Sequence, residues 1–381
     1  MSSLCRRLGI AVAVALLGSG CSINIEHQGR SARPTSELES SVDGWVGEAL
    51  DSGVIAGLSL AVWQGDELRF AKGYGSADLE NDVPAAAETV YRIGSITKQF
   101  TAAAIMRLVE RGDVVLGNDI GDYVDFPTGD HRVTVHQLLN HTSGIKSYTG
   151  LGEAWTRTIP LPITHDVLLG LLADQPFDFA PGDEWRYNNT GFYLLGMIVE
   201  NITDSSYADY LQQEIFDPLG LEDTSYCDEK KLIPHRAEGY ENEDGELVND
   251  DLIDMTHPFA AGALCSNVLD LLRWQQALES GEVVSAASYE RMTTPAPLND
   301  GTALDYGYGF GVDMVDDHRR VAHGGGINGF VTMAARYPDD DLNVIVLTNT
   351  PGPTASDLEQ RIARAALGLP EAKDGEETSF P

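Results

Sequence analysis

The order in which strand and helix patterns follow one another restricts this fold most. Residues 54–63 and 67–74 have the pattern of a hairpin, with Gln64-Gly65-Asp66 at its turn. Strand patterns return late in the chain, at 309–315, 320–323, 330–337 and 342–348. Apolar helix patterns dominate between them, and a closing helix is expected over 355–367. Strands at both ends with helices between predict an α+β fold: one antiparallel sheet built from both termini and flanked by helices, with an inserted mostly helical region.

The same pattern sets the expected boundaries within the 381 residues. A single folded domain is expected over 41–370, with its sheet part at about 41–130 and 290–370 and its helical part at about 131–289. With 43% hydrophobic residues, a chain of this length can bury a sizeable core. Residues 371–381 are expected to be a disordered tail.

Residues 1–20 predict a secretory signal peptide, which stands outside the fold. Arg6-Arg7 precede an apolar stretch over 8–18 that is too short for a permanent membrane span. Cleavage before Cys21 would resemble bacterial lipoprotein processing, although Gly18 stands where an aliphatic residue is usual. The alternatives are a lipid-anchored protein, tethered through 21–40, and a soluble periplasmic one. Both predict an exported protein of the bacterial periplasm or cell envelope.

Composition excludes some functions and leaves one structural question open. A net charge of −34 and only 25 basic residues argue against nucleic-acid binding, which needs clustered cations for the phosphates. With Cys5 in the signal and Cys21 at its end, Cys227 and Cys265 remain in the folded body. In an oxidising compartment the alternatives are a disulfide between these two and two separate buried thiols.

Ser95-Ile96-Thr97-Lys98 opens an apolar helix pattern after the strand-like residues 89–93. The spacing places a hydroxyl and an amine on one face, the minimum apparatus for an acyl-enzyme without a histidine base. The simpler interpretation is a capping serine and a solvated lysine. However, the helix is apolar nearly all round, so it should be buried, and a buried lysine is paired or has a lowered pKa. Either state suits a proton acceptor for Ser95, which favours a serine hydrolase.

Two further motifs carry polar groups on short, turn-rich segments. Tyr187-Asn188-Asn189 stands just before an apolar helix pattern, where the simpler interpretation is a packed tyrosine and a capping asparagine. His323-Gly324-Gly325-Gly326 lies within a strand pattern, where glycines mark the close approach of another backbone or a ligand, with a β-bulge as the alternative.

These three motifs, in this order, resemble the serine β-lactamase and penicillin-binding family, in particular its class C-like branch, which includes D-Ala-D-Ala carboxypeptidases, D-aminopeptidases and esterases. The resemblance runs from about Val42 to about Leu367 and includes residues 91–101, 135–145 and 262–266. It implies the β-lactamase/transpeptidase-like fold, with the motifs in a cleft between the sheet and the helical part. The Ser-x-x-Lys motif belongs to a set described for related enzymes.

The resemblance also implies roles for individual residues. Ser95 would attack an acyl carbon and Lys98 would assist its deprotonation. Tyr187 would shuttle the proton to the leaving group, and Asn189 would bind the substrate amide. The backbone amides of Ser95 and Gly326 would form the oxyanion hole, with a glycine at 326 leaving that amide unobstructed.

The third motif departs from the family's β-lactamases, because His323 stands where they typically have lysine. Histidine is only partly charged near neutral pH, so its grip on a substrate carboxylate would be weaker. Together His323, Gly325 and Gly326 are expected to contact the substrate. His136 and His141 are interpreted as structural, and neither a metal site nor a cofactor is expected.

The predicted substrate is a small molecule or peptide. A D-amino-acid peptide, a β-lactam and a carboxylic ester all remain open, since they share one mechanism and pocket shape decides among them. The alternative of a different class is a penicillin-binding or sensor module that keeps the fold with little or no turnover.

Overall fold

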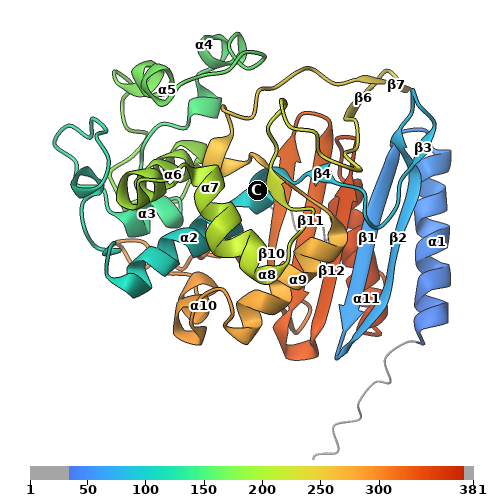
Figure 1. The fold of residues 1–381 in the computed structure, drawn as a ribbon. Helices are drawn as coiled ribbons and strands as arrows, with labels where there is room; N and C mark the ends of the chain where they lie inside the picture. Colours follow the sequence, from blue (N-terminus) through green and yellow to red (C-terminus); the bar gives the residue numbers. More distant parts are fainter. Residues whose placement is uncertain (1–33, 373–381) are drawn as a thin grey trace, which may run out of the picture. The chain divides into compact units, whose positions relative to one another are not determined.

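A seven-stranded antiparallel sheet forms the centre of the computed structural model, which describes residues 34–372 (Figure 1). The strand order is β3-β2-β1-β12-β11-β10-β9. Their bounds are β1 (Gly57–Gln64), β2 (Glu67–Asp78), β3 (Val83–Pro84), β9 (Gly311–Val315), β10 (His318–Ile327), β11 (Phe330–Tyr337) and β12 (Leu342–Thr348). N-terminal β1 pairs with C-terminal β12, with Leu58 opposite Thr348. The prediction of one antiparallel sheet built from both termini is therefore confirmed.

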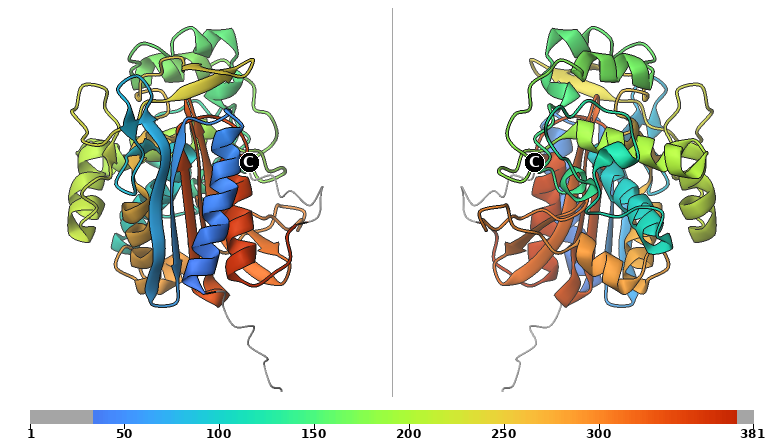
Figure 2. Two further views of the ribbon diagram at one scale, coloured as in Figure 1. Left: turned by 90° about the vertical axis from the view of Figure 1, so that its right-hand side faces the viewer. Right: turned by 90° about the vertical axis from the view of Figure 1, so that its left-hand side faces the viewer.

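Two helices, α1 (Thr35–Asp51) and α11 (Thr354–Ala366), cover one face of this sheet and lie side by side (Figure 2). Leu38, Val42 and Val46 form the buried stripe of α1, spaced by about one helical turn. The linker predicted over 21–40 is thus wrong at its end, because helix begins at Thr35 and Leu38 is already buried. The residues before Leu38 are mostly polar, and one apolar residue per turn was too weak a pattern to predict a helix there.

The opposite face carries the helical part (Figure 1). Its helices are α2 (Thr97–Arg111), α3 (Val135–Leu139), α4 (Glu153–Thr156), α5 (His165–Leu172), α6 (Asn189–Thr203), α7 (Tyr207–Leu211), α8 (Asp217–Leu219), α9 (Val268–Ser280) and α10 (Ala286–Met292). Helix α9 packs on β1 and β12, and α2 packs against α6. Helix α2 therefore belongs with the helical part, although the predicted division assigned it to the sheet part. The apolar residues of α2 pack in one core with residues of both the sheet part and the helical part. The sequence pattern therefore did not show to which part this helix belongs.

Two small sheets complete the fold. The first has the order β4-β8-β5, with β4 (Tyr91–Arg92), β5 (Ser225–Tyr226) and β8 (Leu264–Ser266), and the second pairs β6 (Tyr240–Glu243) with β7 (Glu246–Asn249). The strand expected over 89–93 is thus shorter than predicted. Within residues 34–372, no helix combines the length and apolar character needed to cross a membrane. The predicted signal peptide, Cys21 and residues 373–381 lie outside the described residues.

Candidate active site

The nucleophile candidate Ser95 lies on a tight turn between a strand and a helix. Strand β4 leads into the 3₁₀ turn η1 (Gly94–Ile96), and α2 begins at once with Thr97. Gly94 has a φ of +50°, and a Cβ there would lie 2.9 Å from the backbone nitrogen of Gly326. A side chain at 94 would therefore be strained and would also push the third motif away. This turn brings Ser95 and Gly326 to the same pocket.

Lys98, one helical turn after the serine, is fully buried and held by three oxygen atoms. Its Nζ lies 2.8 Å from Asn189 Oδ1 and 2.7 Å from the Ala261 carbonyl, both pure acceptors. The third contact, at 3.0 Å, is with Ser95 Oγ. A neutral amine has two N–H groups and one lone pair. As an ammonium, Nζ donates to all three oxygens. After loss of one proton its two remaining hydrogens match the two pure acceptors, and its lone pair faces the Ser95 hydroxyl.

The surroundings of Lys98 favour this neutral form. Burial lowers the pKa of Lys98 well below its ordinary value. Its three hydrogen-bond partners are uncharged, so no carboxylate compensates a positive charge at Nζ. The prediction of a buried lysine, in place of a solvated one, is therefore confirmed.

Tyr187 and Asn189 reach the site from the start of α6. Asn188 caps this helix by accepting a hydrogen bond from the Gly191 amide, which leaves the neighbouring Asn189 free to face Lys98. The Tyr187 hydroxyl is buried and makes no well-formed hydrogen bond within the described residues. Burial raises its pKa, and the nearby Ser95 offsets this only in part. Tyr187 is thus a neutral phenol that can donate a proton.

His323, expected to contact the substrate, is buried behind Tyr187. Its Nδ1 donates to the Gly324 carbonyl at 2.5 Å, so Nε2 accepts from the Tyr306 hydroxyl at 2.8 Å. Burial lowers the pKa of His323 to about 3. The expectation of a partly charged histidine is therefore wrong. The sequence showed the residue type but not the burial that removes its charge.

The glycines of the third motif differ in what surrounds them. A Cβ on Gly325 would lie 2.1 Å from the Ile93 carbonyl, so here strand β10 presses against the backbone just before Ser95. Thr332 supports the same contact by donating to that carbonyl at 3.0 Å. Gly326 has open space around its Cβ position and lines the pocket. The close backbone approach thus occurs at Gly325, while Gly326 faces the space where a substrate would lie.

The pocket beside Ser95 has a volume of about 110 Å³. Ser95, Asn189, Ala261, Gly262 and Gly326 form its inner side. We define its outer wall as the remaining lining residues: Tyr148, Thr149, Trp155, Ile253, Pro258, Ile327 and Asn328. Among the described residues, none that lines this pocket carries a charge.

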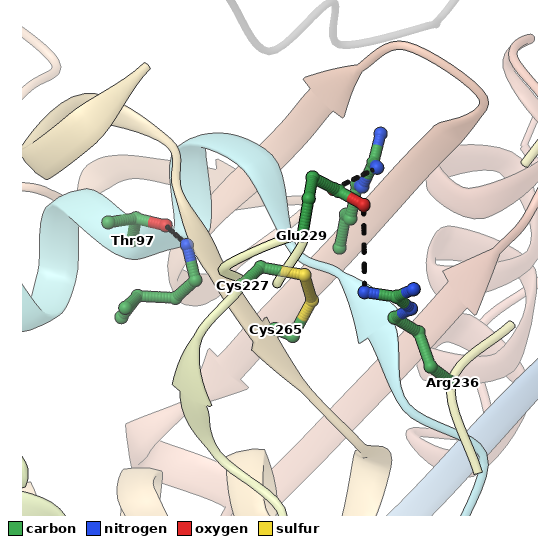
Figure 3. The surroundings of a disulfide bond; sticks show 7 residues. Thr97, Cys227, Glu229, Arg236 and Cys265 are labelled. Carbon is green, nitrogen blue, oxygen red and sulfur yellow. Dashed lines mark hydrogen bonds and ion pairs between the residues drawn. A yellow bond between two sulfur atoms is a disulfide. The ribbon is translucent and has the colours of Figure 1, made fainter. Parts of the chain in front are cut away.

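Residues 260–266, here called the platform, support the nucleophile turn through their backbone. The Leu264 carbonyl accepts from the Ile93 amide at 2.9 Å, and the Leu264 amide donates to Thr97 Oγ1 at 3.1 Å. A disulfide between Cys227 and Cys265 ties the platform to the end of β5 (Figure 3). Of the two alternatives left open by the sequence, the structure has the disulfide.

Ionic contacts next to the disulfide hold the same strands. Glu229 accepts from Arg92 of β4 at 2.5 Å and lies 3.7 Å from Arg236 (Figure 3). Arg92 is also the direct cross-strand partner of Cys265. The loop after Cys227 is therefore attached to β8 by the disulfide and to β4, the strand that leads to Ser95, by the ion pair with Arg92.

Comparison with known proteins identifies this arrangement. The profile of the Beta-lactamase family matches residues 42–369. The chain belongs to the beta-lactamase family. Penicillin-binding protein 4* of Bacillus subtilis (strain 168) is 31% identical over 323 residues, which cover 80% of this chain and 70% of that protein. A D-aminopeptidase of Brucella ovis is 30% identical over 322 residues, 83% of this chain but 60% of the enzyme's own length.

Solved structures of the beta-lactamase fold agree. The octameric penicillin-binding protein homologue from Pyrococcus abyssi superposes with a TM-score of 0.76 at 30% identity, over 88% of this chain and 78% of that one. The predicted family, fold class and hydrolase class are thus confirmed.

The structure brings six of the seven predicted site residues to Ser95 or its immediate surroundings and places His323 one layer behind. Sequence reasoning missed the Ala261 carbonyl, because a backbone acceptor leaves no signature in residue type. It also missed Trp155 and Tyr148, which come from a region without a recognisable motif. The stretch 262–266, which resembles the family, was the one signal that pointed to the platform.

Proposed function

We propose that this protein is a serine hydrolase that cleaves amide bonds through an acyl-enzyme on Ser95, with small D-amino-acid amides or peptides as substrates. The observation that carries the proposal is the bonding of Lys98, whose Nζ has two pure acceptors and the Ser95 hydroxyl around it. Such an amine is a ready proton acceptor at neutral pH.

The proposed reaction has two halves. Ser95 Oγ attacks the amide carbon while its proton moves to Lys98, and the backbone amides of Ser95 and Gly326 stabilise the oxyanion. The proton then passes through Tyr187 to the departing amine, which leaves Ser95 acylated. A water molecule attacks this ester, gives its proton back through the same groups and releases the acid.

The charge of the site favours substrates without a carboxylate beside the cleaved bond. His323 is neutral and buried behind Tyr187, and the described residues that line the pocket carry no charge. A substrate carboxylate would lose its hydration there and gain no cation. A substrate with an amide in place of that carboxylate avoids this penalty, which favours amidase or aminopeptidase activity over carboxypeptidase activity.

D-stereospecificity is proposed from the relatives. The Brucella ovis protein is named a D-aminopeptidase, and this chain matches it over 83% of its own length. The site geometry does not by itself select one enantiomer, so both should be assayed.

A matched pair of substrates tests the proposal. Purified protein and Ser95→Ala are incubated with D-alanyl-D-alanine amide and D-alanyl-D-alanine, and products are followed by mass spectrometry. We expect turnover by the parent alone, at least tenfold faster for the amide. Faster turnover of the free carboxylate would contradict the amidase proposal. A stable adduct with penicillin on Ser95 and no turnover of either dipeptide would favour the penicillin-binding module.

We also propose that the protein works outside the cytoplasm, with Cys21 as its lipid attachment point. The Cys227–Cys265 disulfide supports this location, because such bonds persist in oxidising compartments. Mass spectrometry of the protein from membrane and periplasmic fractions tests it. A diacylglyceryl group on Cys21 is expected for anchoring, and an uncleaved amino terminus in the cytoplasm would contradict export.

A further inference from the structure

Trp155 occupies an unusual place for a large aromatic side chain. Helix α4 is a single turn, and its other residues, Glu153, Ala154 and Thr156, are exposed. Trp155 alone turns inward, where it lines the pocket beside Ser95 and contacts the ring of Tyr148 at a centroid distance of 5.5 Å. A single exposed turn of helix gains little stability from one tryptophan. The position of Trp155 in the pocket wall therefore needs another explanation.

The orientation of Trp155 is fixed from behind by a fully buried histidine. Trp155 Nε1 donates to His257 Nδ1 at 3.1 Å. His257 Nε2 in turn donates to the Leu161 carbonyl at 2.9 Å, so both ring nitrogens are engaged in one tautomer. The indole cannot rotate out of the wall without leaving the buried Nδ1 of His257 unsatisfied.

Three further residues of the outer wall are apolar, whereas Thr149 and Asn328 are polar. Ile253 and Ile327 face the pocket together with Trp155, and Pro258 follows His257 directly. At about 110 Å³ the pocket is smaller than the roughly 150 Å³ cavity that holds a benzene molecule in an engineered protein. One apolar side chain would fill the enclosed volume, and a larger side chain would extend through the open side of the pocket.

We infer that the outer wall binds an uncharged, bulky apolar side chain of the residue whose carbonyl Ser95 attacks, and that Trp155 sets this preference. The inference rests on the proposed hydrolase function. Ser95 and Gly326 line the pocket, whereas Tyr187, which serves the leaving group, does not. The group retained on the acyl-enzyme therefore lies against the outer wall. The substrate class is an amide of an aromatic or branched aliphatic amino acid.

Three amides test the inference, and their ratios do not depend on how much of a variant is folded. We measure kcat/KM for D-phenylalanine amide, D-leucine amide and D-alanine amide, with the L-enantiomers alongside. The parent is expected to prefer the phenylalanine and leucine amides over the alanine amide by at least tenfold. Trp155→Ala should reduce this preference below threefold, mostly by loss of activity on the large substrates. Trp155→Phe should keep most of it.

Trp45→Ala is the matched control, because Trp45 lies on α1 under Arg361, away from the pocket lining. It should leave the ratios unchanged. His257→Leu, which removes the acceptor behind the indole, should lower the preference while Trp155 stays present. An unchanged ratio in Trp155→Ala, or a parent that prefers alanine amide, overturns the inference.

A binding measurement separates this inference from the proposed function. Calorimetry with Ser95→Ala should show at least tenfold tighter binding of D-phenylalanine amide than of D-alanine amide. The double variant Ser95→Ala, Trp155→Ala should lose that difference. If the parent hydrolyses none of the amides but the binding difference is present, the proposed function is wrong and the pocket assignment stands. Equal binding of both amides overturns the pocket assignment whatever the turnover.

Discussion

The platform beneath Ser95 and the outer wall of the pocket are built in opposite ways. The platform is buried, contributes backbone groups to Ile93, Thr97 and Lys98, and is tied down by a disulfide. The outer wall comes from short segments far apart in the chain, and Trp155 stands on a one-turn helix that is otherwise exposed. In the proposed function, the platform fixes the reacting atoms and the outer wall selects the substrate. Changes in the platform should slow all substrates alike, whereas changes in the wall should alter their ranking.

Lys98→Met should have the largest effect and should be the same for every substrate. The substitution keeps a long apolar stem but removes the proton acceptor, so kcat/KM should fall by about 1,000-fold or more. The parent's rate should also decline as pH falls through the lowered pKa of Lys98, because protonation occupies the lone pair that Ser95 needs. Stopped-time assays from pH 5 to 9 measure both effects.

The control for this variant is Lys146→Met, since Lys146 is partly exposed and pairs with Asp178 at 3.0 Å. It should retain near-parental activity. Full activity in Lys98→Met would show that Lys98 is not the base.

Tyr187→Phe should separate chemistry from stability within the same site. In the proposed mechanism the phenol passes a proton to the leaving amine, so turnover should fall by about 100-fold or more. The hydroxyl is buried without a well-formed hydrogen bond, so its removal should leave the free energy of unfolding unchanged or slightly raised. Amide hydrolysis and urea denaturation measure the two quantities. A variant that loses stability and activity together would instead mark Tyr187 as structural.

Removal of the disulfide should lower the rate, which depends on the platform, and should leave the substrate ranking, which depends on the outer wall, unchanged. In Cys227→Ser, Cys265→Ser, kcat should fall about tenfold for all three amides, because β8 loses the tie that holds the Ser95 turn. The cysteines are 38 residues apart, for which loop-closure entropy predicts a loss of about 4 kcal/mol of stability. Activity is measured well below the unfolding midpoint. If the substrate ranking changed while kcat did not, the assignment of these two regions would be reversed.

The sequence predicted the parts of this molecule that depend on residue type and spacing. Ser95 and Lys98 share a helical turn, and alternating strands at both termini leave few ways to build one sheet. The charge of His323 was not predictable, because burial behind Tyr187 lowers its pKa and no local pattern shows that burial. Ala261 acts through its carbonyl, which every residue has, so its role appears only in space.

The outer wall was the least predictable region for the same reason. Trp155 and Ile253 lie almost a hundred residues apart by sequence number and meet only because separate loops fold over the cleft. Neither belongs to a motif with a required spacing. The start of α1 was also missed, since one apolar residue per turn is a weak signal in a polar segment.

Asp250→Asn should give the smallest effect, and one confined to stability. Asp250 lies near the wall segment that carries Ile253, and its Oδ2 is buried without a hydrogen-bond partner among the described residues. Burial, with the charges of Glu241 and Asp251 contributing, raises its pKa to about 6 from an ordinary value of 3.8. The hydrogen bond from the Asp251 amide and the charge of Arg92 oppose this shift. The folded state therefore holds this proton more tightly than the unfolded state. Its contribution to stability is complete below pH 3.8 and is lost as pH rises through 6.

Asparagine keeps the shape of this side chain without the charge, so the variant should match the parent near pH 4 and exceed its Tm by a few degrees at pH 8. Thermal unfolding at both pH values measures the difference, and Asp66→Asn, at an exposed position in the turn between β1 and β2, is the control. Because Asp250 does not line the pocket, the ranking of the three amides should stay the same. A changed ranking would mean that strain at Asp250 reaches the outer wall through Ile253. The outer wall would then depend on the protein behind it, although its segments are short and separate.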